Sequence, residues 1–348
     1  MSATGTLTSP SDVAAPRRPV ASRLAWFAVA VVVAAVIALA SVAFGARLVG
    51  WSDIVSAFTG DETGIAQAAV QKRVPRTLLA LLIGAALGLS GAVMQGVTRN
   101  ALADPGILGV TNGAALAVVT GIAFFSMTSP TTYIFVAIAG AAVSAIFVYS
   151  VGSLGRGGAT PLKLALAGAA TAAAFSSLVS AILLPRINVM NEFRFWQIGG
   201  VGGGTFASIS LVLPFLIVGA VICFASARGL NSLALGEDVA AGLGERVATT
   251  RLMAAAGAVL LCGAATAVAG PIGFVGLVVP HVCRLLVGID HRWLLPFSTL
   301  VGAILLTAAD VVGRVVARPS EVDVGIITAL VGAPFFISIV RRQKVRSL

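Results

Sequence analysis

The chain has 348 residues, of which 58% are hydrophobic and only 10% charged, and its mean hydropathy is +1.02. A soluble domain carries about 25% charged residues, so this composition excludes a soluble globular protein and predicts an all-α polytopic membrane protein. The net charge of +10 does not indicate nucleic-acid binding, because the Lys and Arg residues are scattered between apolar runs instead of being clustered with aromatic side chains.

The chain is expected to form one transmembrane domain with short tails. Residues 1–20 are rich in Ser, Thr, Ala and Pro and are predicted to be a disordered cytoplasmic tail. Residues 21–342 form the predicted membrane domain, and residues 343–348 a basic tail. A span needs about 20 apolar residues. Ten segments qualify, of which the third and the eighth are short and interrupted by Gly or Pro: 23–45, 76–97, 110–126, 131–151, 163–184, 206–227, 251–269, 272–288, 294–313 and 323–340.

Ten spans place both termini on one side of the membrane. If that side is the cytoplasm, its segments hold most of the 23 Lys and Arg residues, in agreement with the positive-inside rule. The basic run 341–346 is the clearest part of this bias, although a lipid-binding or nucleic-acid-binding tail is the alternative. The sequence therefore predicts a multi-pass membrane protein with both termini in the cytoplasm.

Polar residues interrupt the apolar pattern around the second predicted span. Arg73 and Arg76 flank Pro75 where the chain is expected to enter this span from outside, and the stretch 94–113 carries an arginine, an acid, a proline and several amides. Polar groups and broken helices are expensive inside a membrane protein, and they commonly mark functional sites. The topology rule alone does not explain Arg73 and Arg76.

Several motifs of energy coupling are missing from the sequence. It contains no G-x-x-x-x-G-K-[ST] phosphate loop, and the glycine run 199–204 is interpreted as a flexible turn. An ATP-driven protein of this sequence therefore needs a separate ATPase. No acid lies in the middle of a predicted span, which argues against a proton- or sodium-coupled secondary transporter, the first rival hypothesis. Asp310 comes closest, and Arg314 follows at a spacing that permits an ion pair.

The sequence offers no pattern for catalysis or metal binding. His281 and His291 have no nearby nucleophile or second ligand, and Cys223, Cys262 and Cys283 lie in apolar segments without a C-x-x-C pair. We therefore predict no metal site and no enzymatic activity. A membrane-embedded enzyme is the second rival hypothesis.

Six motifs in one order resemble a known family. The chain is similar to the vitamin B12, ferric-siderophore and haem permease family of bacterial ABC importers over about residues 65–342. The motifs are Arg73-Val-Pro-Arg76, Gly-Ala-x-Met-Gln at 91–95, Thr-Arg-Asn-Ala-Leu-Ala-Asp-Pro-Gly-Ile-Leu-Gly-Val at 98–110, Leu-Gly-Glu-Asp-Val-Ala-Ala-Gly-Leu-Gly at 235–244, Gly-Pro-Ile-Gly-Phe-Val-Gly-Leu-Val-Val-Pro-His at 270–281 and Asp-His-Arg-Trp-Leu-Leu-Pro at 290–296.

The resemblance implies a type II ABC importer permease and its partners. These are a second permease subunit, identical or paralogous, two ATPase subunits that carry ATP and Mg, and an extracytoplasmic substrate-binding protein; no cofactor is implied for this chain. Residues 98–106 and 193–200 resemble ferric-siderophore permeases of the enterobactin type. The implied cargo is an Fe(III)–siderophore chelate, with haem or cobalamin as the alternative.

The resemblance also assigns docking and coupling residues. Matching arginines in the family receive acids of the binding protein, which implies docking by Arg73, Arg76 and Arg314; lipid-headgroup anchoring is the alternative. The loop 228–251 contains a predicted short amphipathic helix at 235–246 with acids in its first turn, where the helix dipole favours them. The resemblance makes this helix the ATPase-coupling element, with a solvated loop as the alternative, and its residues are Leu235, Gly236, Glu237, Asp238, Ala241, Leu243 and Gly244.

The expected gate residues lie in three short segments. Asn100 and Leu102 match family positions that close the cytoplasmic end of the pathway, but this chain has Ala101 where relatives commonly have proline. Thr160 and Pro161 lie near the other gate region, and a simple turn and helix start is the alternative. Arg194 and Trp196 are expected either to meet an anionic chelate or to belong to an interfacial aromatic belt.

Overall fold

The computed structural model describes residues 19–46, 50, 64–154 and 160–346. The predicted tail 1–20 lies almost wholly outside the described residues, whereas residues 343–346 of the predicted basic tail continue the last helix. The helices are α1 (Val20–Ala43), α3 (Ile65–Thr98), η1 (Pro105–Leu108), α4 (Val110–Phe125), α5 (Pro130–Ser153), α6 (Pro161–Leu183), α7 (Ile187–Ile198), α8 (Phe206–Ala225), α9 (Ala227–Ala234), α10 (Glu237–Gly242), α11 (Val247–Ala269), α12 (Val275–Val287), α13 (His291–Val316) and α14 (Val324–Arg346).

Each of the ten predicted spans corresponds to an apolar helix. Among the described residues, seven helices are long and apolar enough to cross a membrane by length and composition, and α4, α12 and α14 contribute shorter apolar segments. The 13 residues of α12 cover about 20 Å at a rise of about 1.5 Å per residue, less than a bilayer core of about 30 Å. The non-helical residues 270–274 precede α12, and Pro271 lies against Gly199. The prediction of a polytopic helical fold is confirmed.

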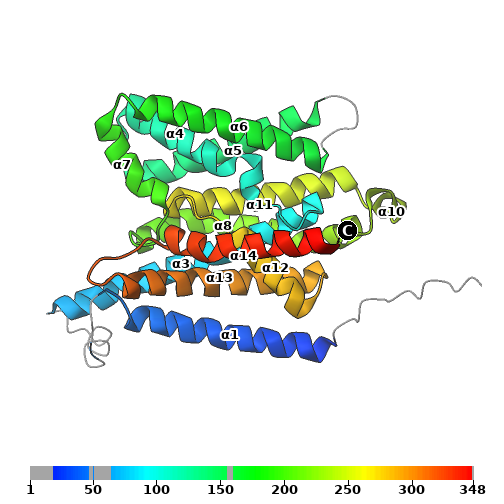
Figure 1. Cartoon of the computed structure of the whole chain (residues 1–348), viewed down its shortest axis with the longest axis horizontal. Helices are drawn as coiled ribbons and strands as arrows, with labels where there is room; N and C mark the ends of the chain where they lie inside the picture. Colours follow the sequence, from blue (N-terminus) through cyan, green and yellow to red (C-terminus); the bar gives the residue numbers. More distant parts are fainter. Residues whose placement is uncertain (1–18, 47–49, 51–63, 155–159, 347–348) are drawn as a thin grey trace, which may run out of the picture.

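The helices lie side by side in one bundle with two distinct ends (Figure 1). We call the end where α1 and α13 finish and α3 begins the arginine end; α7 lies there as well. The opposite end, which carries α9 and α10, is the α10 end. Helices α4, α5 and α6 pack on one another at one side of the bundle, and α1 forms the other side against α13. The two ends are therefore joined by several continuous helices.

Glycine allows α3 to lie close to its neighbours at the centre of the bundle. A Cβ atom at Gly84 would overlap the carbonyl oxygen of Gly302, and one at Gly88 would overlap the carbonyl oxygen of Ser298. Small residues permit such close helix packing where lipid supplies no hydrophobic drive between helices. These glycines therefore act as local packing residues, and α3 and α13 form one closely packed pair.

Burial separates the central helices from the peripheral ones. The most apolar 18-residue stretch of α3 is 78% buried, whereas the corresponding stretches of α1 and α6 are 11% and 17% buried. The outward faces of α1 and α6 are apolar, as expected for surfaces that meet lipid or another apolar partner. The three cysteines are free and buried inside the bundle: Cys223, Cys262 and Cys283.

Two details differ from the sequence-based expectation. Helix α3 begins at Ile65 instead of near residue 76, so Arg73, Pro75 and Arg76 lie within the helix and not at its entrance. Ten residues of α3 precede Pro75, so this proline lies in the helix interior, where it removes one backbone N–H donor. Helix α7 was not predicted; it follows α6 after a short break at the arginine end.

Candidate functional sites at the two ends of the bundle

At the arginine end, three arginines satisfy the carbonyl oxygens where α1 finishes. Arg73 donates to two carbonyl oxygens of residues 41–45 at 3.1 and 2.9 Å, and Arg314 donates to two others at 2.9 and 3.1 Å. Arg318 donates to the fifth at 2.9 Å. The last carbonyls of a helix have no intrahelical donor, and leaving them unpaired in an apolar environment costs several kcal/mol. These arginines therefore fix the end of α1 against α3 and α13.

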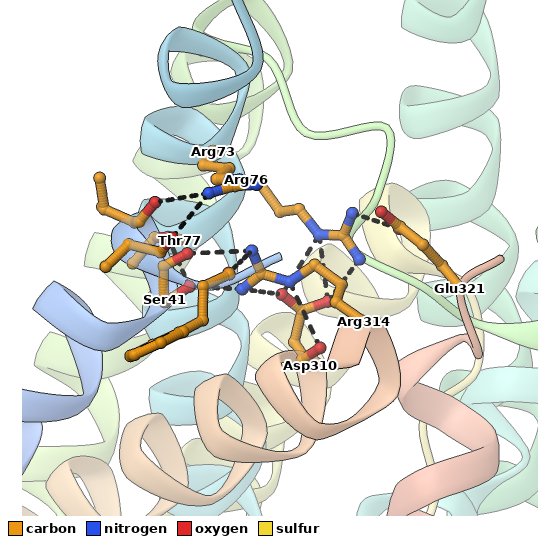
Figure 2. Close-up of polar contacts among 10 residues, drawn as sticks. Ser41, Arg73, Arg76, Thr77, Asp310, Arg314 and Glu321 are labelled. Carbon is orange, nitrogen blue, oxygen red and sulfur yellow. Dashed lines mark hydrogen bonds and ion pairs between the residues drawn. The ribbon is translucent and has the colours of Figure 1, made fainter. Parts of the chain in front are cut away.

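Asp310 lies below the surface of the arginine end and pairs with two arginines, Arg314 and Arg76 (Figure 2). Its carboxylate pairs with Arg314 at 2.9 Å and with Arg76 at 2.7 Å, and the predicted Asp310–Arg314 ion pair is thus confirmed. Arg314 also donates to the Ser41 hydroxyl at 2.6 Å, and that hydroxyl lies 2.7 Å from the hydroxyl of Thr77. The side chains of Asp310 and Arg314 are each 1% exposed, so a partner at the surface meets neither of them.

Arg76 extends from this cluster to the surface. Its Nη1 atom donates to the carboxylate of Glu321 at 2.6 Å, on the segment between α13 and α14. The side chain of Arg76 is 12% exposed and that of Glu321 is 41% exposed. Arg76, one of the three arginines expected to dock a partner, is thus paired with an exposed acid.

The structure brings the three predicted docking arginines together but buries most of their surface. Arg73 is 6% exposed, and Arg314 is 1% exposed. Lys72 and Arg318, which were not predicted as site residues, are exposed at the same end. Lys72 directly precedes Arg73 and Arg318 lies four residues beyond Arg314, so adjacency to the motif arginines was the available signal. A pocket of about 400 Å³ is lined by Lys72, Arg73, Arg76, Arg314 and Glu321 together with small residues.

At the α10 end, the predicted short helix is present with its acids in the first turn. Glu237 pairs with Arg251 of α11 at 2.7 Å. The hydrogen bond from Arg251, supported by the charge of this arginine, lowers the pKa of Glu237, so the carboxylate of Glu237 is ionised at neutral pH. Gly236 and Gly244 border the helix with positive φ angles of 116° and 83°, a conformation that glycine adopts without steric cost. The structure adds α9, which directly precedes this unit.

The unit around α10 presents apolar side chains outward. Leu235 is 62% exposed, Val239 is 51% exposed and Leu243 is 67% exposed, whereas Ala240 is buried against the bundle. Clustered exposed apolar residues commonly mark a protein interaction site. The remaining predicted coupling residues, Asp238 and Ala241, are also exposed.

A hydrogen-bonded joint fastens α9 to the start of α13. Asn231 accepts from the backbone N–H of His291 at 2.9 Å, lies 2.8 Å from its Nδ1 atom, and donates to Asp290 at 2.7 Å. Burial raises the pKa of Asp290, but hydrogen bonds from Asn231 and from the N–H of Arg292, with nearby arginine charges, outweigh it and lower the pKa overall. Since α13 carries Asp310 at its other end, this joint connects the α9–α10 unit to the helix that holds the arginine cluster.

The predicted gate residues Asn100 and Leu102 form the turn after α3. Arg99 ends the helix in the left-handed conformation, with φ 52°, and the Asn100 side chain accepts from the N–H of Leu102 at 2.9 Å. This side-chain turn forms with Ala101 in place of the usual proline. Thr160 and Pro161 begin α6, where the Thr160 hydroxyl accepts from the N–H of Lys163 at 3.4 Å. Helix α6 contacts η1, so both predicted segments lie toward the α10 end.

Arg194 and Trp196 belong to α7 and therefore lie at the arginine end, away from the other predicted gate residues. Arg194 is exposed. The ring of Trp196 packs against Phe193 with centroids 5.5 Å apart. Its indole Nε1 is buried without a hydrogen-bond acceptor among the described residues. The structure thus distributes the predicted path residues over both ends of the bundle.

This architecture defines a class: a polytopic helical membrane protein whose charged and apolar surface sites lie at opposite ends of a continuous bundle. The chain belongs to the FecCD transport family, which matches residues 31–342. The family resemblance inferred from the motifs is confirmed.

Relatives and a solved structure agree with this membership. The chain is 45% identical over 305 residues to the ferric enterobactin transport system permease protein FepD of Escherichia coli (strain K12), covering 87% of this chain and 91% of FepD. It is 43% identical, with the same coverage of both chains, to the probable siderophore transport system permease protein YfiZ of Bacillus subtilis (strain 168). A solved structure, described as an inward-facing metal-chelate type ABC transporter, is 29% identical with a TM-score of 0.80 and covers 92% of this chain and 99% of its own.

Replacing Asp310 by Asn is expected to destabilise the fold. The substitution leaves the buried Arg314 guanidinium without its counter-charge, and breaking a buried ion pair from one side costs about 3–5 kcal/mol. We expect a lower midpoint of thermal unfolding for the detergent-purified protein. Glu321→Gln is the control, because a surface ion pair contributes about 0–1 kcal/mol. Equal midpoints for the two variants would contradict a structural role for Asp310.

Proposed function

We propose that this chain is the transmembrane permease subunit of an ATP-driven importer that moves an Fe(III)–siderophore chelate across the cytoplasmic membrane. The observation that carries the proposal is the separation of two sites: a cationic surface at the arginine end and an apolar unit around α10 at the other. The similarity to permease proteins named for siderophore transport supports the cargo. The chain itself carries no phosphate loop, which supports a separate ATPase as the source of energy.

In this proposal the arginine end faces outward and both termini lie in the cytoplasm. The basic residues of the predicted cytoplasmic segments support this orientation through the positive-inside rule. A substrate-binding protein docks at the arginine end, where arginine forks suit carboxylates and surface charges steer association. Arg76 makes the direct contact, with the exposed Lys72 and Arg318 beside it, while Arg73 and Arg314 support it from below.

The α10 unit is proposed to dock on the ATPase subunit, which displaces it as ATP is bound and hydrolysed. Its exposed apolar side chains suit a groove in the ATPase, and the Asn231 joint transmits its displacement to α13. Because α13 is closely packed on α3, movement at the α10 end tilts helices that reach the arginine end. Two copies of the permease, or this chain and a paralogue, enclose the path, with Asn100, Leu102, Thr160 and Pro161 near its cytoplasmic end and Arg194 and Trp196 near its mouth. Alternating access follows from such rigid-body helix movements.

The cargo is tested by uptake in a strain that lacks its own siderophore permeases. Expression of this chain with its partner subunits is expected to restore ATP-dependent accumulation of radiolabelled iron supplied as a ferric siderophore, with ferric enterobactin as the first probe. Haemin and cobalamin are supplied in parallel, because the family resemblance includes both. Uptake of haemin or cobalamin alone would replace the siderophore cargo, and uptake that persists without ATP would support a secondary transporter.

The docking role of Arg76 is tested by Arg76→Ala. We expect binding of the purified substrate-binding protein to nanodisc-embedded transporter to weaken about tenfold, which corresponds to about 1.4 kcal/mol. Arg228→Ala removes an exposed charge at the α10 end and is expected to leave this affinity unchanged. Equal losses in the two variants would contradict docking at the arginine end.

The coupling role of the α10 unit is tested by Leu243→Asp. Leu243 is 67% exposed, so the added charge leaves the permease fold intact but disfavours an apolar interface with the ATPase. We expect loss of co-purification with the ATPase and loss of uptake, with an unchanged melting midpoint. Val316→Asp alters a residue that is 75% exposed at the other end and serves as the control. Normal ATPase assembly with Leu243→Asp would exclude the α10 unit as the coupling element.

A further inference from the structure

The guanidinium of Arg76 is shared between two acids that differ in accessibility (Figure 2). Its Nε and Nη2 atoms contact Asp310, with the closest distance 2.7 Å, and its Nη1 atom contacts Glu321 at 2.6 Å. The side chain of Asp310 is 1% exposed, whereas that of Glu321 is 41% exposed. One side of the arginine fork is therefore held inside the bundle, and the other is held by an acid at the surface.

Glu321 is more easily displaced from Arg76 than Asp310 is. Asp310 also neutralises the buried Arg314, so its removal from Arg76 would disturb the whole cluster. Within the described part of the chain, Glu321 forms its ion pair with Arg76 alone, and it belongs to the connection between α13 and α14. An ion pair with an exposed member is worth about 0–1 kcal/mol, so rotation of Glu321 into solvent is inexpensive.

The surroundings of Arg76 leave room for such an exchange. Gly202 borders the pocket, and a Cβ atom at that position would lie 3.7 Å from Nη1 of Arg76, so this wall lacks a side chain that would block access. Among the described residues that line the pocket, Glu321 is the acid that faces Lys72 and the three arginines. A carboxylate of a docking partner that reaches Arg76 must therefore take the place of Glu321.

We propose that Glu321 is an intrachain competitor for the docking partner. It occupies the exposed side of Arg76 in the free permease, and an acid of the substrate-binding protein displaces it on docking. The competition lowers the affinity of docking, both through the ion pair that must break and through repulsion between two carboxylates at one arginine. It thereby favours release of the binding protein after delivery. This inference rests on the proposed docking of a binding protein at the arginine end.

The test is the affinity of the substrate-binding protein for nanodisc-embedded transporter that carries Glu321→Gln. The glutamine keeps the size of the side chain and removes its charge, and we expect binding to tighten about fivefold, the factor that corresponds to about 1 kcal/mol. The gain is expected to shrink at high ionic strength, because salt screens exposed charges. Unchanged or weaker binding would overturn the competition.

Asp323→Asn is the matched control for loss of one negative charge. Asp323 lies two residues from Glu321, against Gly200, and it forms no ion pair within the described part of the chain. We expect less than about a twofold change in affinity, because it does not occupy the arginine fork. An equal gain from Asp323→Asn would assign the effect to the general surface field and overturn the specific role of Glu321.

Combination with Arg76→Ala separates this inference from the proposed function on which it rests. If Arg76→Ala alone leaves docking unchanged, the docking site itself is wrong. If Arg76→Ala weakens docking but Glu321→Gln gives no gain, docking holds and the competition is wrong. The competition requires that the gain from Glu321→Gln disappear in the Arg76→Ala background, and a gain that persists there would contradict it. Melting midpoints of all variants establish that each comparison concerns folded protein.

Discussion

The arrangement of the arginine end depends on satisfying the carbonyl oxygens where α1 finishes. Helix α1 is a peripheral helix with little buried surface, and its last carbonyls have no partners within the helix. Arg73 on α3 and Arg314 on α13 supply the missing donors. The buried carboxylate of Asp310 forms an ion pair with Arg314. Because these bonds come from two helices, they fix the relative positions of α1, α3 and α13 at this end.

The arginines at this end therefore have two roles, one structural and one at the surface. Arg73 and Arg314 have mainly a structural role, because their N–H groups donate to backbone carbonyls and, for Arg314, to a buried acid. Arg76 satisfies the same acid but keeps one side at the surface, where Glu321 meets it. The buried cluster thus positions Arg76 with one side of its guanidinium at the surface, and in our proposal the acid beside it sets how readily a partner gains that group.

The close packing of α3 on α13 carries this arrangement through the molecule. Glycines at 84 and 302 bring the two backbones together, and the same α13 begins at the Asn231–His291 joint with α9. Helices packed this closely move together as a rigid body, because packed cores do not deform continuously. The physical link between the two ends is therefore a pair of helices, and it includes α13 in addition to the helix that carries the Arg73-Val-Pro-Arg76 motif.

The sequence by itself determined the helical membrane fold, the ten apolar segments, the short third and eighth spans, a short helix within 235–246 and the family. These follow from local composition, from periodicity and from motifs whose spacing is read along the chain. It also indicated the Asp310–Arg314 pair, because four residues on a helix bring two side chains together. Only the tertiary structure decided that α3 starts before Arg73, that Arg314 is buried while Lys72 and Arg318 are exposed, and that Arg76 meets Asp310 and Glu321. Those facts depend on contacts between residues more than two hundred positions apart, and no local pattern specifies which exposed charge at a helix end becomes buried when another helix packs over it.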